Sequence, residues 1–521
     1  MSKAKTVDMT NGHLTRNIIL YSLPLIATNI LQILYNAADV LVVAKWAGGT
    51  AMAAVGATTS LVHLTVNLFL GISTGANVVV ATCLGSKEEQ GIKKSVHTAM
   101  FLSIICGVIT AVLGILTAKP LLRLMSTPDD IINQSTLYMQ IYFVGVPAFM
   151  IYNFGAAILR AAGDTKRPFY ILTTSGIINI LLNLLFVIRF NLSVAGVAIA
   201  TSISQIFSAV CIMVLLMRAD KQPYKLELKN FKLNKRYALK ILTSGIPIGI
   251  QSALFSFANI NIQSSINYFG SAAVSGNTAA RTIDDMLSAT TDATNFACIS
   301  FTAQNVGAKN YKNVKKVFFN CLIISMVVTG VLGTLITVFS KEILSLYAAT
   351  SSAAGTVSLD EIIHYGTIRF FFIALFNPIC AAMTTMTGSS RGLGYSVSPT
   401  VVTLISVCVF RITWLMTVFK HLNTTIEAVY ITFPLSWLIC VLLFAPFLIR
   451  HMKKTKIKLS GNKDKVHTNI INEDAVGKNI ISEDRVNTAF VNEDLTYENI
   501  IGEEIINEDT VNKDTAFKEN S

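Results

Sequence analysis

Charged residues are scarce in this chain of 521 residues. Asp, Glu, Lys and Arg together make up 14% of it, whereas hydrophobic residues make up 52% and the mean hydropathy is +0.56. Soluble domains usually carry about a quarter charged residues, so this composition excludes an ordinary water-soluble protein. Apolar stretches of about 18 residues or more recur along the chain, and each is long enough to cross a bilayer. The composition therefore predicts an integral membrane protein.

Several chemical signatures are missing as well. The sequence has no HExxH, GxSxG or Walker pattern and no evident nucleophile–base pair, which argues against an enzyme. The eight cysteines stand singly in apolar stretches, without a CxxC or a Cys/His cluster, so neither a disulfide framework nor a cysteine metal site is indicated. We therefore predict no catalytic residue and no cofactor.

The positive charge is unevenly placed. Residues 461–521 hold 6 Lys/Arg against 14 Asp/Glu, and the other residues hold 36 against 16. The cations of the apolar part lie in short loops between apolar stretches, which is typical of the positive-inside rule and not of nucleic-acid binding. Alternate loops carry 27 and 8 Lys/Arg. This asymmetry predicts that both termini are cytoplasmic.

Hydropathy predicts an all-α polytopic protein with twelve transmembrane helices in two pseudo-symmetric lobes of six. The predicted spans are 17–44, 51–84, 95–117, 132–159, 169–188, 193–217, 238–267, 279–305, 317–340, 362–388, 398–419 and 426–449. We divide the chain into an N-terminal lobe (1–217), a cytoplasmic linker (218–240), a C-terminal lobe (241–450) and a cytoplasmic tail (451–521).

The two predicted lobes repeat each other at a nearly constant offset. Pro24 and Pro247 are 223 residues apart, Gly85 and Gly307 are 222 apart, and Arg160, Gly163 and Pro168 match residues 391, 394 and 399 at an offset of 231. Because each half has an even number of spans, both halves insert the same way up. The axis that relates them then runs along the membrane normal, with the substrate path between the lobes.

The last part of the chain follows a different pattern. The segments NIINEDAV, NIISEDRV, AFVNEDLT and NIIGEEII recur every ten residues and place a glutamate at 473, 483, 493 and 503. An acidic low-complexity repeat with few aromatic residues does not bury enough apolar surface to fold alone. We predict a disordered tail, and a strip that binds a partner is the alternative.

Polar residues inside apolar spans are costly and therefore informative. In the first span, the side chains Asn29, Gln32, Asn36 and Asp39 recur with helical spacing, so they share one stripe. Lipid cannot satisfy such a stripe, which must face water or another polar helix. Asp39 is the only acid in the first two spans, and no cation in its span can pair with it. We therefore interpret Asp39 as a functional carboxylate.

Other spans of the first half add amide and hydroxyl groups. Asn179 and Asn183 lie four residues apart in the fifth span, the sixth span has Thr201, and the fourth has Asn153. Each alone is typical of a helix–helix hydrogen bond. Together with Asp39 they offer the oxygen ligands that Na⁺ requires, and they suit a carboxyl group that exchanges a proton equally well.

The second half is not equivalent to the first. The repeat aligns Asn36 with Asn259 but Asp39 with Ile262. We expect Asp284 and Asp285 to form local ion pairs with Arg281. Asp292 lies deeper and lacks an evident partner, which leaves a substrate contact and a structural acid as alternatives, and Arg411 in the eleventh span is similarly open. The candidates for the substrate cavity are Gln32, Asn36, Asn259, Gln263 and Asp292.

Five segments together resemble a known family, the multidrug and toxic compound extrusion (MATE) transporters. They are PLIATNILQILYNAADVLVVAKWAG, LGSKEEQG, ILRAAGDTKRP, VAIATSIS and TAQNVGAKN, and the resemblance covers residues 14 to about 450.

The resemblance implies a secondary active exporter of amphipathic, often cationic, small molecules. It would work in a bacterial inner membrane by rocker-switch alternating access, in exchange for H⁺ or Na⁺. In one branch the cation site lies in the N-terminal lobe, and its positions fall here on Asp39, Asn179, Asn183 and Thr201, with Asn153 beside them. Family members often show NIxLDP where this chain has NILLN, so Asn183 stands at a place often held by Asp. We expect a monomer, and no metal site beyond Na⁺ at Asp39.

Two other functions were compared with this one. A lipid-linked oligosaccharide flippase of the same superfamily is the alternative, although it predicts a strongly cationic cavity and often fourteen spans, whereas the deepest charges here are mostly acidic. The other function is that of a receptor or scaffold that uses the acidic tail. The partners predicted are small-molecule substrates and the lipid bilayer, and not nucleic acid.

Overall fold

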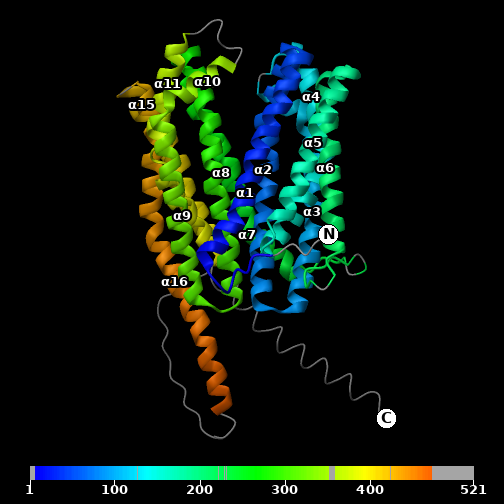
Figure 1. Cartoon of the computed structure of the whole chain (residues 1–521), viewed down its shortest axis with the longest axis vertical. Helices are drawn as coiled ribbons and strands as arrows, with labels where there is room; N and C mark the ends of the chain where they lie inside the picture. The colour runs from blue at the N-terminus through cyan, green and yellow to red at the C-terminus, as the bar shows by residue number, and fades with distance from the viewer. Residues whose placement is uncertain are drawn as a thin grey trace. The chain divides into compact units, whose positions relative to one another are not determined.

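The computed structural model describes residues 6–125, 127–220, 222–227, 229, 231–350, 358–422 and 424–471. This part of the chain forms helices and contains no strand (Figure 1). Large apolar side chains on the outer helix faces, such as Leu116, Leu181 and Leu442, are 60–70% exposed, as lipid-facing residues should be. Ten of the described helices are long and apolar enough to cross a membrane, or eleven when one bent pair counts as a span. The predicted all-α polytopic fold is confirmed.

The first half of the chain forms six long helices that match the six predicted spans. They are α1 (Leu14–Val42), α2 (Gly49–Ser86), α3 (Glu89–Leu124), α4 (Asp129–Ala161), α5 (Lys166–Leu184) and α6 (Ser193–Met217). Short π-helical segments prolong α1 and α5, namely η1 (Val43–Ala47) and η2 (Leu185–Arg189). α4 packs against α2, α3 and α6, so it lies at the centre of this half.

The second half contains more breaks. Its elements are α7 (Lys235–Asn267), α8 (Ser271–Gly307), α9 (Tyr311–Val338), α10 (Ser340–Thr350), α11 (Leu359–Ile373), α12 (Asn377–Gly392), α13 (Val397–Thr403), η5 (Leu404–Val409), α14 (Phe410–Trp414), η6 (Leu415–Phe419), α15 (Ile426–Tyr430) and α16 (Thr432–Ile471). The tenth predicted span is divided into α11 and α12, which meet at 44°. Pro378 in the first turn of α12 favours a helix start there, because proline has no N–H to donate.

Two details differ from the predicted spans. α8 is more polar than the ten apolar helices counted above, yet it packs against α2, α9, α11 and α12. When α8 and the bent pair are included, the number of spans among the described residues reaches the predicted twelve. α16 continues as a helix to Ile471, beyond the end of the last predicted span at residue 449, so the helix extends into the predicted tail. The rest of the predicted tail, with the acidic repeats, lies outside the described residues.

The backbone repeats itself in the way the sequence predicts. Lys87 and Lys309 both have a left-handed φ, of 58° and 54°, after α2 and α8, and Gly163 and Gly394 have 84° and 94°. α2 and α8 cross through reciprocal contacts, because a Cβ on Gly85 would overlap the backbone of Gln304 and a Cβ on Gly307 would overlap that of Thr82. Reciprocal contacts between equivalent residues are the signature of a two-fold relation. This confirms two pseudo-symmetric halves.

Glycines also set the distance between α2 and α7. A Cβ on Gly71 would overlap the backbone of Gly249, and a Cβ on Gly75 would meet the backbone of Gly245. Small residues at such a crossing let two helix backbones approach closely within a membrane. We call this contact the glycine crossing.

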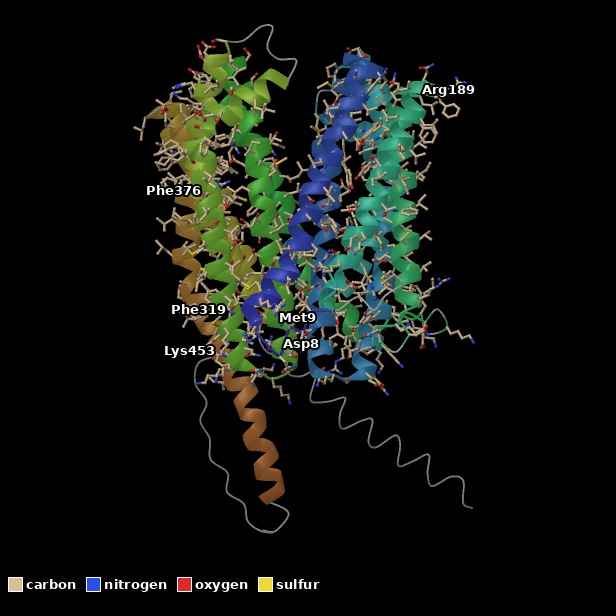
Figure 2. All side chains as sticks on the ribbon, in the orientation of Figure 1. Asp8, Met9, Arg189, Phe319, Phe376 and Lys453 are labelled. Atoms are coloured by element: carbon tan, nitrogen blue, oxygen red, sulfur yellow. The ribbon has the colours of Figure 1, made fainter. Side chains whose placement is uncertain are left out.

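Residues 6–13 form an N-terminal strap that touches both halves. The Val7 amide donates to the carbonyl of Gly163 at 3.0 Å, in the connection between α4 and α5. From the other half, Asn305 donates its Nδ2 to the Met9 carbonyl at 2.8 Å, and Asn313 donates to the Thr10 carbonyl at 2.7 Å. Figure 2 places Asp8 and Met9 at the end of the bundle opposite Arg189. The strap thus links the halves at one end.

A buried hydrogen-bond network joins the halves near the strap. Tyr21 of α1 donates its hydroxyl to Ser300 Oγ at 2.9 Å, and Ser300 donates to Oδ1 of Asn77 in α2 at 3.0 Å. Arg160, at the end of α4, places its guanidinium 5.3 Å from the centre of the Phe296 ring in α8. The Tyr21–Ser300–Asn77 hydrogen bonds thus connect α1 and α2 of the first half with α8 of the second.

Candidate cation site in the first six helices

The ends of α1 and α5 are held together by an aromatic contact. Gly176 of α5 leaves room for the ring of Tyr35 of α1, since a Cβ at that position would overlap the ring. The Tyr35 hydroxyl donates to the Thr173 carbonyl at 3.1 Å. One turn further along α1 comes Asp39, and two turns further along α5 comes Asn183. The packing at Tyr35 therefore sets the register that brings these two side chains together.

Four of the five predicted cation-site residues form one hydrogen-bonded group, which we call the Asp39 cluster. Asn183 donates its Nδ2 to Oδ1 of Asp39 at 2.5 Å and to Oδ1 of Asn179 at 3.3 Å. Asn179 in turn donates to Oγ1 of Thr201 at 3.3 Å. Three helices, α1, α5 and α6, thus contribute to one polar site inside the bundle.

In the Asp39 cluster, the two asparagine side chains are more deeply buried than the carboxylate. Asn183 is fully buried and Asn179 is 5% exposed, whereas Asp39 is only partly buried. The Oδ1 atom of Asn183 is buried and accepts no hydrogen bond. A buried acceptor without a donor costs free energy. The cluster therefore has an oxygen that a cation or an additional donor would satisfy.

The set of atoms fits a small hard cation or a proton better than a transition metal. Its oxygens come from one carboxylate, two amides and one hydroxyl, and hard cations prefer such oxygen ligands. Within the described ranges, no three or more His, Cys, Asp or Glu side chains gather as a metal group. A single carboxylate also offers one site for a proton.

The helices change their winding next to the cluster. η1 begins four residues after Asp39, and η2 begins two residues after Asn183. Single π-helical turns within α-helices are often found at functional sites. These turns were not predicted from the sequence.

The remaining predicted site residue is not joined to the cluster. Asn153 donates its Nδ2 to the Phe149 carbonyl of its own helix at 2.8 Å, which is the ordinary way in which an amide is satisfied in a helix. The hydrogen bonds thus bring Asp39, Asn179, Asn183 and Thr201 together and leave Asn153 on α4.

The substrate-cavity candidates are more dispersed. Asn36, Asn259 and Asp292 are exposed, and Gln32 is half-buried. Among the described residues, no hydrogen bond joins these four side chains to one another. Gln263 is placed differently, because it donates to Asn267 at 2.9 Å and accepts from Asn277 at 3.3 Å.

A buried polar group in the second half was not foreseen from the sequence. Arg369 of α11 donates its Nε to Oδ2 of Asp284 at 2.8 Å and its Nη1 to Oδ1 of Asn277 at 2.9 Å. Tyr430 of α15 donates its hydroxyl to the same Asn277 oxygen at 3.2 Å. Both charged side chains are less than 10% exposed. The predicted pairing of Asp284 with Arg281 is therefore wrong, because Asp284 pairs instead with Arg369 inside the bundle.

The other charges of this half follow simpler rules. Arg281 and Asp285 form the predicted exposed pair, with Nε and Oδ2 3.9 Å apart. Arg411 is buried, donates its Nε to Ser436 Oγ at 3.0 Å and places its guanidinium 4.1 Å from the centre of the Phe433 ring. Arg411 thus connects α14 with α16.

Comparison with known proteins adds the decisive observation. The MatE family model matches residues 24–185 and residues 247–416, which is well over half of the chain and falls once in each half. The chain belongs to the MatE family. The two matched segments begin at Pro24 and at Pro247, the same pair of prolines that marks the repeat. The family resemblance seen in the sequence is confirmed.

Similar proteins are named as multidrug resistance proteins. The chain is 28% identical over 450 residues to "Probable multidrug resistance protein YoeA" of Bacillus subtilis (strain 168), covering 85% of this chain and 95% of that protein. It is 22% identical to "Probable multidrug resistance protein NorM" of Thermotoga maritima, covering 76% and 84%.

A solved structure supports the fold in the same way. A MATE crystal structure in complex with MaL6 superposes with a TM-score of 0.80 at 19% identity, covering 87% of this chain and all of that one. The membrane-spanning MatE fold thus accounts for nearly the whole of the described part of the chain. The names of the relatives refer to multidrug resistance.

Proposed function

We propose that this MatE protein is a monomeric secondary active exporter that exchanges amphipathic or cationic small molecules for H⁺ or Na⁺. The observation that carries the proposal is the Asp39 cluster, with its single carboxylate and the unsatisfied oxygen of Asn183. A buried carboxylate is costly while it is charged and unpaired. A proton or Na⁺ relieves that cost, so ion occupancy and the packing of α1 against α5 and α6 are coupled.

Coupling requires that the ion and the drug favour different conformations. We infer that the lobes 1–217 and 241–450 move relative to each other, with the linker 218–240 between them. In the present conformation they are joined by the N-terminal strap and by the Tyr21–Ser300–Asn77 network. We assign this closed end to the cytoplasmic side, so the conformation is open outward, where a proton or Na⁺ reaches Asp39.

Substrate selection follows from the exposed polar residues of the helices. Asp292 offers an exposed carboxylate on α8, and Asn36 and Asn259 offer exposed amides on α1 and α7. A carboxylate and a few amides among apolar side chains favour bulky amphipathic cations and select loosely among them. We propose that Asp292 contacts the positive charge of the substrate.

Ion exchange is tested directly in proteoliposomes. With a proton gradient or a Na⁺ gradient imposed alone, ethidium should move against its own gradient under one of the two conditions and not without a gradient. The reciprocal flux is measured with a pH-sensitive or Na⁺-sensitive dye and should require ethidium. Transport that proceeds equally under no gradient, or ion flux independent of drug, would remove the exchange mechanism.

Orientation is tested by labelling single cysteines in a variant whose eight native cysteines are replaced. We expect Ser271→Cys, at the first residue of α8, to react with a membrane-impermeant maleimide added to intact cells, because this position and Lys45 belong to the sparsely charged side. Lys93→Cys, in the first turns of α3, should react only after the cells are opened. The reverse pattern would place both termini outside.

A further inference from the structure

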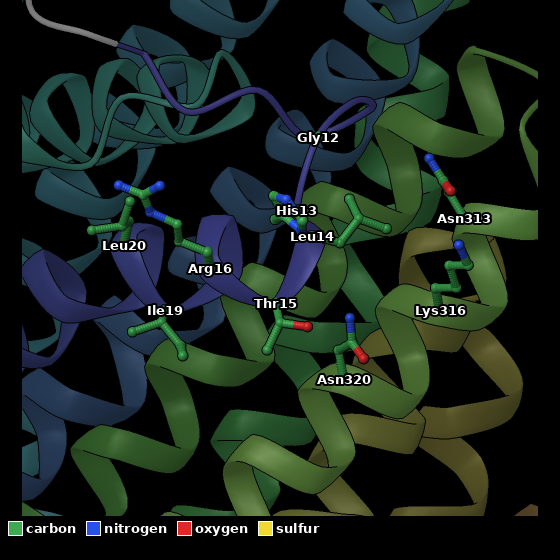
Figure 3. A pocket seen from close by; sticks show the side chains of 10 residues that line it. All are labelled: Gly12, His13, Leu14, Thr15, Arg16, Ile19, Leu20, Asn313, Lys316 and Asn320. Carbon is green, nitrogen blue, oxygen red and sulfur yellow. The ribbon is translucent and has the colours of Figure 1, made fainter.

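A cavity of about 620 Å³ lies beside the beginning of α1 and the beginning of α9 (Figure 3). Its polar lining comes from both helices and consists of His13, Thr15, Arg16, Asn313, Lys316 and Asn320. α1 belongs to the first half of the molecule and α9 to the second. The cavity is therefore lined by both lobes.

The lining has positive charge and no negative charge. Arg16 and Lys316 carry exposed cationic side chains on opposite walls, and no Asp or Glu is among the residues that line the cavity. Guanidinium and ammonium groups are the usual ligands of phosphate in proteins, the first by paired hydrogen bonds and the second as a point charge. Asn313 does not compete for this role, because its Nδ2 already holds the Thr10 carbonyl.

The walls become apolar in the direction of the membrane interior. Ile19 and Leu20, one turn beyond Arg16 on α1, line the cavity and are each 41% exposed. On α9, Phe319 and Ile323 do not line the cavity, but they follow Lys316 along the helix and are 54% and 59% exposed. A ligand that meets both parts has an anionic head and apolar chains.

We propose that this cavity binds the phosphate of an anionic phospholipid, with Arg16 and Lys316 as its main ligands and the acyl chains along the exposed residues of α1 and α9. Basic pockets between membrane helices on the cytoplasmic side bind such headgroups. A free phosphate ion would gain nothing from Ile19 and Leu20. The lipid, in contrast, buries apolar surface and charge together.

The position of the site gives the lipid a consequence for the whole molecule. Asn313 lines the cavity and also holds the N-terminal strap at Thr10. A lipid phosphate bound by Arg16 of one lobe and Lys316 of the other bridges the lobes at the end where the strap joins them. It therefore stabilises the conformation seen here, and releasing it favours separation at this end.

The test uses the full-length protein in detergent, with lipid binding followed by native mass spectrometry. The probes are phosphatidylglycerol and phosphatidylcholine with the same acyl chains. We expect phosphatidylglycerol to bind more tightly, and Arg16→Gln/Lys316→Gln to weaken its binding about twentyfold, because each cation beside an anionic lipid contributes a factor of about five. The charge-preserving Arg16→Lys/Lys316→Arg should retain most of the binding and shows whether the site tolerates substitution.

The matched control removes the same charge elsewhere at this end of the bundle. Lys93→Gln/Lys94→Gln on α3 takes away two exposed cations that do not line the cavity, so phosphatidylglycerol binding should not change. Equal loss in both double variants would mean general surface attraction and overturn the site. So would equal binding of phosphatidylcholine, and displacement by soluble glycerol 3-phosphate would show a phosphate site and overturn the lipid.

Discussion

Asp39→Asn is expected to reach the membrane in wild-type amounts and to export no drug. The variant keeps the shape of the side chain and an oxygen that accepts from Asn183 Nδ2, so the Asp39 cluster remains assembled. Because the substitution removes a membrane-embedded charge, it should change the free energy of unfolding by no more than about 1 kcal/mol. Unlike aspartate, the asparagine side chain cannot alternate between a charged and a neutral form. Efflux should therefore fall to the level of cells without the protein.

The measurement is ethidium or fluoroquinolone efflux in a pump-deficient bacterium, with the amount of protein in the membrane determined in parallel. Asp285→Asn is the matched control, since it neutralises an exposed acid that is paired with Arg281 in the other half. It should leave efflux unchanged. Full efflux by Asp39→Asn would refute the coupling role and direct attention to Asp292.

Arg369→Met is expected to lower the free energy of unfolding by about 3–5 kcal/mol, because it leaves Asp284 buried without its partner. The loss should be visible as a clear fall in the midpoint of thermal unfolding in detergent. Asn277 and Tyr430 lose their place in the network at the same time, which adds to the effect. Arg369 also lies 5.7 Å from the Tyr430 ring centre, so part of the loss comes from packing.

The comparison with the exposed pair isolates the effect of burial. Arg281→Met breaks the Arg281–Asp285 contact at the surface, where ion pairs contribute about 0–1 kcal/mol. The double variant Asp284→Leu/Arg369→Met should be more stable than Arg369→Met alone, because it leaves no buried charge unpaired. A double variant that is as unstable as the sum of the two single variants would show that the charges do not act as a pair.

Much of the fold follows from the sequence because the membrane restricts what a chain can form. Only helices satisfy every backbone group within a span, so apolar stretches and repeated motifs lead directly to two related sets of six. The ends of the spans are less determined. α16 continues to Ile471 because a polar segment with good helix formers prolongs a helix that the membrane has already started, and hydropathy alone does not register this.

The hydrogen-bonded grouping of the Asp39 cluster was predictable because its evidence is local. Asp39 has no cation in its span, and Asn179 and Asn183 share one helix face. The buried group of Asp284, Arg369 and Asn277 depends instead on α8 meeting α11, a contact between helices far apart in the chain. The cavity of the proposed lipid site likewise exists only where α1 meets α9.

The glycine crossing bears on how the molecule responds to mutation and to heat. Where Gly71 and Gly75 face Gly245 and Gly249, main chain touches main chain. Backbone atoms have no side-chain rotamers, so thermal motion of side chains does not loosen this contact. For the same reason, α2 and α7 can slide against each other at these glycines without any side chain repacking there. Its tolerance for substitution is correspondingly small, because even one methyl group would force α2 and α7 apart. Sequence drift should therefore be slow at these four glycines.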